Sequence, residues 1–181
     1  HNVGFMVLDS WMNYHNYKFD KTKFNGEYSI IKYNNEDVII LKPLSFMNLS
    51  GTVVLSFVNY FKIDIDDILV IYDDKDIELG SVKLKKNGSC GGHNGIRNII
   101  DNLKTDKFKR LKVGLSKNNT DMVSFVLGKF SNVEKCKLDN VLKETNNILD
   151  DYFILTFDNL MSKYNKKGWL YVKTFWYKEV S

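Results

Sequence analysis

Apolar and polar positions follow two different periods along the chain, and each period predicts one kind of element. Apolar side chains recur at helical spacing in residues 3–17 and 50–61, which predicts two amphipathic helices. Short β-branched runs at residues 28–33 and 37–41 predict two strands, joined by a turn at Asn-Asn-Glu. Similar patterns predict further strands at residues 68–72, 81–86 and 110–115, and helices at residues 93–103, 121–127 and 133–157.

Two of the predicted strands differ in their surroundings. Residues 68–72 (ILVIY) form a continuous apolar run that ends in acidic residues, which is typical of a strand buried on both faces. Residues 81–86 alternate apolar side chains with Lys83 and Lys85, so we expect a half-exposed strand with both lysines on one face. Strands and helices interleave along the 181 residues without a repeat or linker. The sequence therefore predicts a single α/β domain, a mixed β-sheet covered by helices.

Charge and cysteine usage narrow the possible classes of protein. The formal net charge of +4 is compatible with a polyanionic partner but does not require one. Cys90 and Cys136 lie far apart and form no Cys-x-x-Cys pair, which argues against a disulfide framework and a zinc ribbon. No apolar run approaches the roughly 20 residues of a membrane span, and no signal-peptide pattern opens the sequence. We therefore expect a cytoplasmic protein without a membrane partner.

Polar residues of the types that act in catalysis and binding lie in four segments: residues 1–2 (HN), 46–51 (FMNLSG), 73–76 (DDKD) and 88–95 (GSCGGHNG). In open α/β sheets, ligands bind outside the carboxyl ends of the strands. From the predicted order of elements, three of these segments can reach that edge, with the acidic residues just past the end of the most buried strand. The pattern predicts a site there.

Each segment also has a purely structural explanation. Asn48 or Ser50 can cap the helix that follows, and the acidic residues 73–76 can form a solvated turn. The glycines can supply positive φ angles, with His93 and Asn94 as cap residues. None of these explanations accounts for all four segments in this order.

Six motifs occur in order between residue 1 and about residue 130: HNVGF, FMNLSG, DDKD, GSCGGHNG, RLKVG and FVLGKF. In this order and spacing they resemble the successive signatures of the bacterial-type peptidyl-tRNA hydrolases. GGHNG and FMNLSG are highly specific, whereas DxxD alone is weak. The resemblance implies a monomeric enzyme, without metal or cofactor, that hydrolyses the ester between a peptide and its tRNA.

The resemblance also implies a role for each matching polar residue. His1 is the expected general base, which takes a proton from the attacking water. Asp73 is expected to hold the imidazole in the right tautomer and to stabilise the imidazolium. Asn94 is expected to orient the water and Asn48 to bind the peptide backbone. Either amide can also stabilise the developing oxyanion.

Further substrate contacts follow from the same resemblance. Phe46 and Met47, next to the expected peptide-binding amide, are expected to contact the substrate. Lys85 and Lys112 are expected to clamp the 5′-phosphate of tRNA. The residues alone favour ordinary solvated lysines. The family more often has arginine at the second place, and lysine offers a point charge instead of a bidentate fork.

The sequence departs from the family pattern at both ends. Family members begin with a strand that ends in Gly-Asn-Pro-Gly, followed by a tyrosine and the catalytic histidine. Here the sequence starts at the histidine, so we expect the N-terminal strand of the family to be absent from this chain and the fold to be impaired. Beyond a hydrolase-like domain of residues 1–165, the aromatic and basic residues 166–181 have no assigned role; an added strand and a stacking surface for RNA are both open.

Two other functions compete with this interpretation. A non-catalytic RNA-binding relative would retain the fold without turnover. A metal-dependent peptidase would use Asp73, Asp76 and His93 as ligands, although no recognisable metal motif is present.

Overall fold

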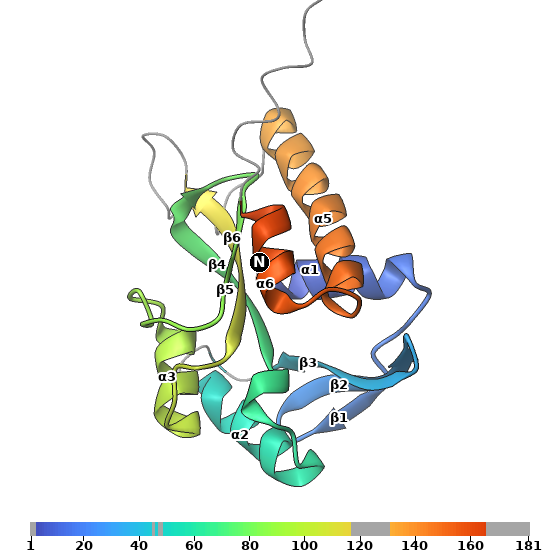
Figure 1. Ribbon diagram of the computed structural model, residues 1–181, viewed down its shortest axis with the longest axis vertical. Coiled ribbons are helices and arrows are strands. Elements are labelled where there is room, and N and C mark those ends of the chain that lie inside the picture. Colours follow the sequence, from blue (N-terminus) through green and yellow to red (C-terminus); the bar gives the residue numbers. More distant parts are fainter. Residues whose placement is uncertain (1–2, 45, 47–48, 117–130, 166–181) are drawn as a thin grey trace, which may run out of the picture.

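The strands form two three-stranded sheets in the computed structural model, which describes residues 3–44, 46, 49–116 and 131–165 (Figure 1). The first sheet is antiparallel, with strand order β1-β2-β3: β1 (Lys21–Lys23), β2 (Gly26–Tyr33) and β3 (Glu36–Pro43). The second is mixed, with strand order β4-β6-β5: β4 (Leu69–Glu78), β5 (Val82–Lys85) and β6 (Lys109–Ser116). β4 runs parallel to β6 and β5 antiparallel to it. The predicted α/β domain with a mixed sheet is confirmed.

Helices cover both faces of the second sheet. They are α1 (Val3–Tyr14), α2 (Ser50–Phe61), α3 (Asn94–Leu103), α5 (Asn132–Tyr152) and α6 (Phe157–Tyr164), with a short 3-10 helix η2 (Ile65–Asp67) before β4. On one face, α1 and α5 pack around Val113, while α6 packs around Leu111. On the other face, Ile96 and Ile99 of α3 pack against Tyr72 of β4. Within the described residues, none of the helices combines the length and apolar character that a membrane span requires.

One carboxylate joins three elements far apart in sequence. Asp150 Oδ1 accepts hydrogen bonds from Trp11 Nε1 at 2.8 Å, from Tyr33 Oη at 2.8 Å and from His15 Nε2 at 2.7 Å. Burial raises the pKa of Asp150, but these hydrogen bonds outweigh burial and leave the pKa below its ordinary value. Asp150 therefore fastens α1 and β2 to α5 as an ionised group.

Several predicted boundaries are wrong for local reasons. The first helix ends at Tyr14, before residue 17, because Asn16 adopts φ 60° and the Tyr17 N–H bonds back to the Met12 carbonyl. The helix predicted at 133–157 is two helices, because the chain leaves α5 after Tyr152 and Thr156 caps α6 through the Asn159 N–H. β1 was not predicted. The helix predicted at 121–127 and the segment 166–181 lie outside the described residues.

β4 differs from its prediction in two ways. It continues to Glu78, so the acidic residues 73–76 belong to the strand and neither follow it nor form a solvated turn. Its apolar residues Leu69, Val70 and Ile71 are only partly buried. β4 is an edge strand, because β6 is its only partner among the described residues.

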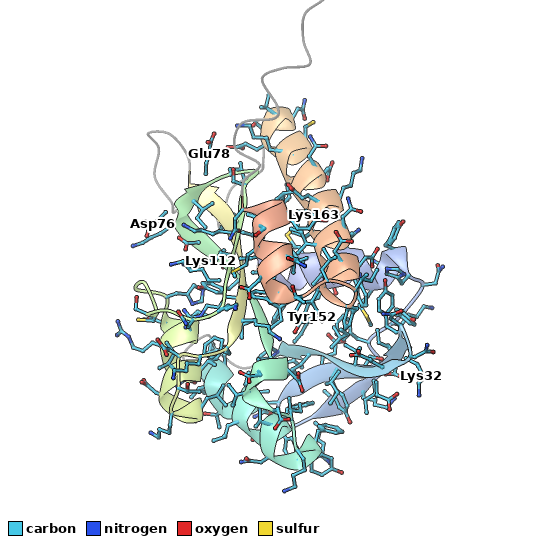
Figure 2. The ribbon with its side chains drawn as sticks, in the orientation of Figure 1. Lys32, Asp76, Glu78, Lys112, Tyr152 and Lys163 are labelled. Carbon is cyan, nitrogen blue, oxygen red and sulfur yellow. The ribbon has the colours of Figure 1, made fainter. Side chains whose placement is uncertain are left out.

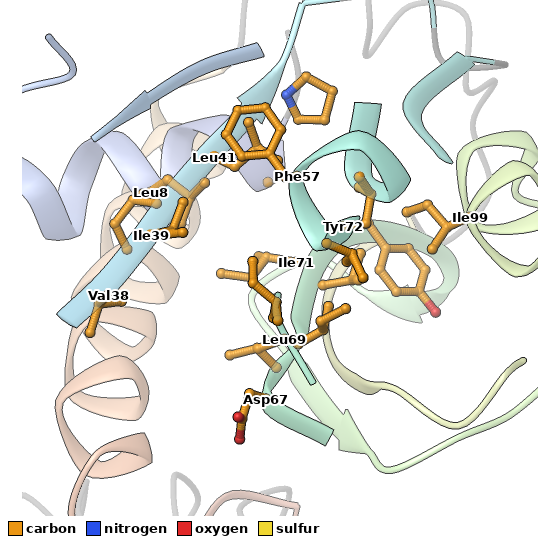
Figure 3. Close-up of a pocket in the computed structure, with 18 of the residues that line it drawn as sticks. Leu8, Val38, Ile39, Leu41, Phe57, Asp67, Leu69, Ile71, Tyr72 and Ile99 are labelled. Atoms are coloured by element: carbon orange, nitrogen blue, oxygen red, sulfur yellow. The ribbon is translucent and has the colours of Figure 1, made fainter. Parts of the chain in front are cut away.

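An apolar groove separates the two sheets. Ile39 and Leu41 of β3 line one side, Leu69 and Ile71 of β4 line the other, and Leu8 of α1 also contributes (Figure 3). The volume is about 770 Å³. Like β4, β3 has a strand partner on one side only among the described residues. We call this space the β3–β4 groove.

Candidate active site

Two acid–base pairs lie beside the middle of β4. Asp73 and Asp74 are consecutive in the strand, so their side chains point to opposite faces. Asp73 Oδ1 lies 3.9 Å from His93 Nε2. Asp74 Oδ2 lies 2.6 Å from Lys112 Nζ. A register shift in β4 between Asp74 and Glu78 bends the strand beside both pairs.

His93 faces Asp73 with a defined nitrogen. It is the N-cap of α3, and its Nδ1 accepts a hydrogen bond from the Ile96 N–H at 3.2 Å. In a neutral ring the proton is then on Nε2, the nitrogen nearest the carboxylate. The distance exceeds that of a hydrogen bond, so the contact is electrostatic. The His93 side chain lowers the pKa of Asp73 against the opposing effect of burial, which leaves the carboxylate ionised at neutral pH.

The glycine-rich loop before His93 is tied to β6 by a buried arginine. Arg110 has no exposed surface, and its guanidinium donates hydrogen bonds to the carbonyls of Gly88, Ser89 and Asp106. It also lies over the Phe108 ring, 4.5 Å from the centroid. Sequence reasoning gave Arg110 no role. The same strand contains Lys109 and Lys112, so the sequence did not single out Arg110.

The loop residues have the conformations that glycine permits. Gly91 and Gly92 adopt φ angles of 53° and 78°, which non-glycine residues rarely adopt. His93 is indeed a cap residue, whereas Asn94 is the first residue of α3 and is exposed beside it.

Lys83, Lys85 and Lys112 lie on one face of the second sheet but differ in their exposure to solvent. Lys83 and Lys85 are both exposed on the same face of β5, as predicted. Lys83 pairs directly with Lys112 across the sheet, and Lys85 pairs with Arg110. Lys112 is 15% exposed and bonded to Asp74, so it is not an ordinary solvated lysine. Burial lowers the pKa of Lys112, but its hydrogen bond to Asp74, the charge of that carboxylate and the interactions with Tyr72 together outweigh burial and leave the pKa raised.

The FMNLSG segment is only partly described. Met47 and Asn48, like His1, lie outside the described residues. Phe46 is 83% exposed and borders an open pocket with Leu44 and Leu49. The N-cap of α2 is Leu49, whose side chain accepts no hydrogen bond.

The start of α2 is instead held by the neighbouring helix. Asn98 Oδ1 of α3 accepts a hydrogen bond from the Gly51 N–H at 2.7 Å. A Cβ atom at Gly51 would overlap the carbonyl group of Asn98, so only glycine permits this approach.

The β3–β4 groove and the acid–base residues belong to one pocket. Ser50, Asp73 and His93 line the same cavity as the apolar side chains of β3 and β4. Asp73, Asp76 and His93 do not form a metal-ligand cluster, and no group of three His, Cys, Asp or Glu side chains suited to a metal occurs within the described part of the chain.

Comparisons with known proteins agree with this arrangement. The family model described as Peptidyl-tRNA hydrolase matches residues 1–170. A peptidyl-tRNA hydrolase of Lactobacillus helveticus is 44% identical, with 91% of this chain and 90% of the relative covered. One of Clostridium botulinum is 42% identical, with 91% and 86% covered. The crystal structure of peptidyl-tRNA hydrolase from Acinetobacter baumannii superposes with a TM-score of 0.82 at 27% identity, covering 92% of this chain and 86% of that one. The chain therefore belongs to the peptidyl-tRNA hydrolase family.

Proposed function

We propose that this protein hydrolyses the ester between a peptide and tRNA. The observation that carries the proposal is the position of Asp73. In a chain of this family, Asp73 is an ionised carboxylate that lines the same pocket as the β3–β4 groove. His93, which ends the glycine-rich loop just before Asn94, lines this pocket beside it.

The proposed chemistry is a general-base hydrolysis. The water oxygen attacks the ester carbonyl carbon while the His1 imidazole takes a proton from the water. Asp73 stabilises the imidazolium that forms. The tetrahedral intermediate then collapses, and the tRNA oxygen leaves with the proton from the imidazolium. The products are a peptide with a free carboxyl group and tRNA.

The remaining polar groups serve binding in this proposal. Asn94 and Asn48 orient the water and the peptide, and either amide can donate to the oxyanion. Phe46 contacts the peptide in this proposal, which its exposure beside an open pocket supports. Lys85 and Lys112 contact tRNA phosphate from one face of the second sheet. We further propose that the protein acts as a monomer in the cytoplasm, without metal or cofactor.

Release of peptide from a labelled peptidyl-tRNA tests the proposal. His1→Ala should abolish nearly all turnover and leave tRNA binding largely intact, while EDTA should have no effect. Cys90, in the glycine-rich loop before His93, provides a control. Hydrogen bonding with the Gly92 backbone and with Arg97 lowers the pKa of its thiol, but the thiol has no role in the proposed chemistry. Cys90→Ala should therefore retain activity. Inhibition by EDTA, or loss of turnover in Cys90→Ala, would overturn the assignment, and binding without turnover in the unmodified chain would favour the non-catalytic relative.

A further inference from the structure

The ion pair between Asp74 and Lys112 is more enclosed than the others on the described surface. Its side chains are 13% and 15% exposed, and no other ion pair between described residues has both partners below one fifth. The carboxylate is also fixed from its other side, because Asp74 Oδ1 accepts a hydrogen bond from the Asp76 N–H at 2.8 Å. One oxygen is held by the backbone and the other by the lysine, so the pair is preorganised.

The pair lies beside two lysines with no comparable restraint. Lys83 stands opposite Lys112 in the sheet, and Lys85 follows on the same face. Both are exposed. Opposed side chains in an antiparallel pair have Cβ atoms about 4.5–5.5 Å apart. Three ammonium groups therefore gather on one face, and Asp74 neutralises the innermost of them.

We propose that Asp74 limits how tightly the face formed by Lys83, Lys85 and Lys112 holds RNA. The proposal rests on the phosphate-binding role proposed above for Lys112. RNA phosphate that approaches Lys112 must compete with a carboxylate already bound at 2.6 Å, and it also meets the negative charge of that carboxylate. Lys112 therefore contributes less to RNA binding than it would without its carboxylate partner. Peptidyl-tRNA shares this face and additionally has its peptide contacts at the pocket, so the restraint weakens the binding of substrate and product alike and leaves the product less tightly held once the ester is cut.

Three variants separate the effect of the ion pair on RNA binding from the effect of net charge. Asp74→Asn frees Lys112 and raises the net charge by one. Asp76→Asn raises the net charge equally but leaves the ion pair intact, since Asp76 is exposed and projects outward from β4 (Figure 2). Asp74→Asn with Lys112→Met keeps the original net charge and removes the pair, an exchange of both partners that a fold tolerates better than the loss of one.

Binding of deacylated tRNA, measured by fluorescence anisotropy between 50 and 200 mM salt, tests the proposal. Release of Lys112 adds at most one full phosphate contact, which steepens the log–log salt slope by up to about 0.9 and tightens binding by up to roughly fifteenfold at 50 mM and roughly fourfold at 200 mM. We expect these changes in Asp74→Asn only. Asp76→Asn should keep the original slope, and the double variant, which lacks the Lys112 ammonium group, should bind no more tightly and with no steeper slope than the unmodified chain.

The outcomes distinguish this inference from the proposed function. If Asp74→Asn unfolds at the same temperature as the unmodified chain and binds deacylated tRNA no more tightly than Asp76→Asn, the inference is wrong even when peptidyl-tRNA is cleaved. The same slope change in the double variant would also overturn it, because Lys112 would then not be the group released. Tighter binding in Asp74→Asn without any hydrolysis by the unmodified chain would support the inference and refute the proposed function.

Discussion

The β3–β4 groove predicts a specific gain from an added strand. The change is an N-terminal extension of five apolar residues followed by Gly-Asn-Pro-Gly and a tyrosine, joined to His1. Gly4 and Leu8 of α1 line the groove, so a strand that lies in the groove can continue directly into α1. The edges of β3 and β4 that have no strand partner among the described residues offer hydrogen-bonding groups on both sides of the added strand.

The magnitude follows from burial, hydrogen bonding and ordering. Four apolar side chains buried in the groove contribute about 8 kcal/mol, and about five hydrogen bonds to the two edges contribute about 5 kcal/mol. Ordering the backbone and side chains of five residues costs about 10 kcal/mol. The extended chain should be more stable by about 3 kcal/mol, which raises Tm by roughly 6–12 °C in a domain of this size.

Thermal unfolding followed by circular dichroism, together with kcat/KM for peptidyl-tRNA, measures the effect. The matched control is an extension of equal length made of glycine and serine. Both extensions place the same number of residues and a peptide group before His1, so they do not differ in the charge next to its ring. The comparison between them therefore isolates the strand. Equal Tm and equal kcat/KM in the two extended chains would refute the reasoning.

Three further predictions concern single side chains. His93→Asn keeps a cap for α3 but removes the group that lowers the pKa of Asp73. The acid limb of the kcat/KM profile should therefore move to higher pH, and an unmoved limb would show that His93 does not act on Asp73. Lys85→Ala should raise KM more than it lowers kcat and flatten the salt slope of tRNA binding by about one; an unchanged slope would mean that Lys85 is only solvated. Asp150→Asn should destabilise the fold at pH 7 by about 2–3 kcal/mol, measured by urea unfolding. Because the folded pKa of Asp150 is lowered, its charge contributes above the unfolded value of about 3.9 and is lost as the pH falls through the folded pKa. The difference between variant and unmodified chain should therefore shrink in acid, and a pH-independent difference would contradict this account.

Local patterns in the sequence predicted the elements that local interactions determine. The turn between β2 and β3 is an example, since Asn34 and Asn35 both adopt positive φ angles of 51° and 64°. Asparagine tolerates this conformation, and a two-residue hairpin requires it. The lysine face of β5 was predicted for the same reason, because alternation in a strand depends only on its own residues.

Features that depend on distant partners could not be predicted. The apolar run of β4 indicates burial but not which edges are paired, so its edge position and the groove beside it were missed. The motif comparison selected Asp73 but gave no partner for Asp74, because Lys112 lies 38 residues away on β6. The same holds for Arg110, whose acceptors are backbone carbonyls that carry no sequence signal.

The contact between Gly51 and Asn98 limits how the pocket can open. Because the first turn of α2 is bonded to α3 and touches its backbone, the two helices should move as one rigid body. Neither helix can then rotate alone to widen the space around Ser50 and His93, both of which lie at helix starts. A hinge that admits a bulky peptide ester has to lie in the chain outside this unit, such as Gly91 and Gly92, which follow the carbonyls held by Arg110 and adopt positive φ angles that glycine permits.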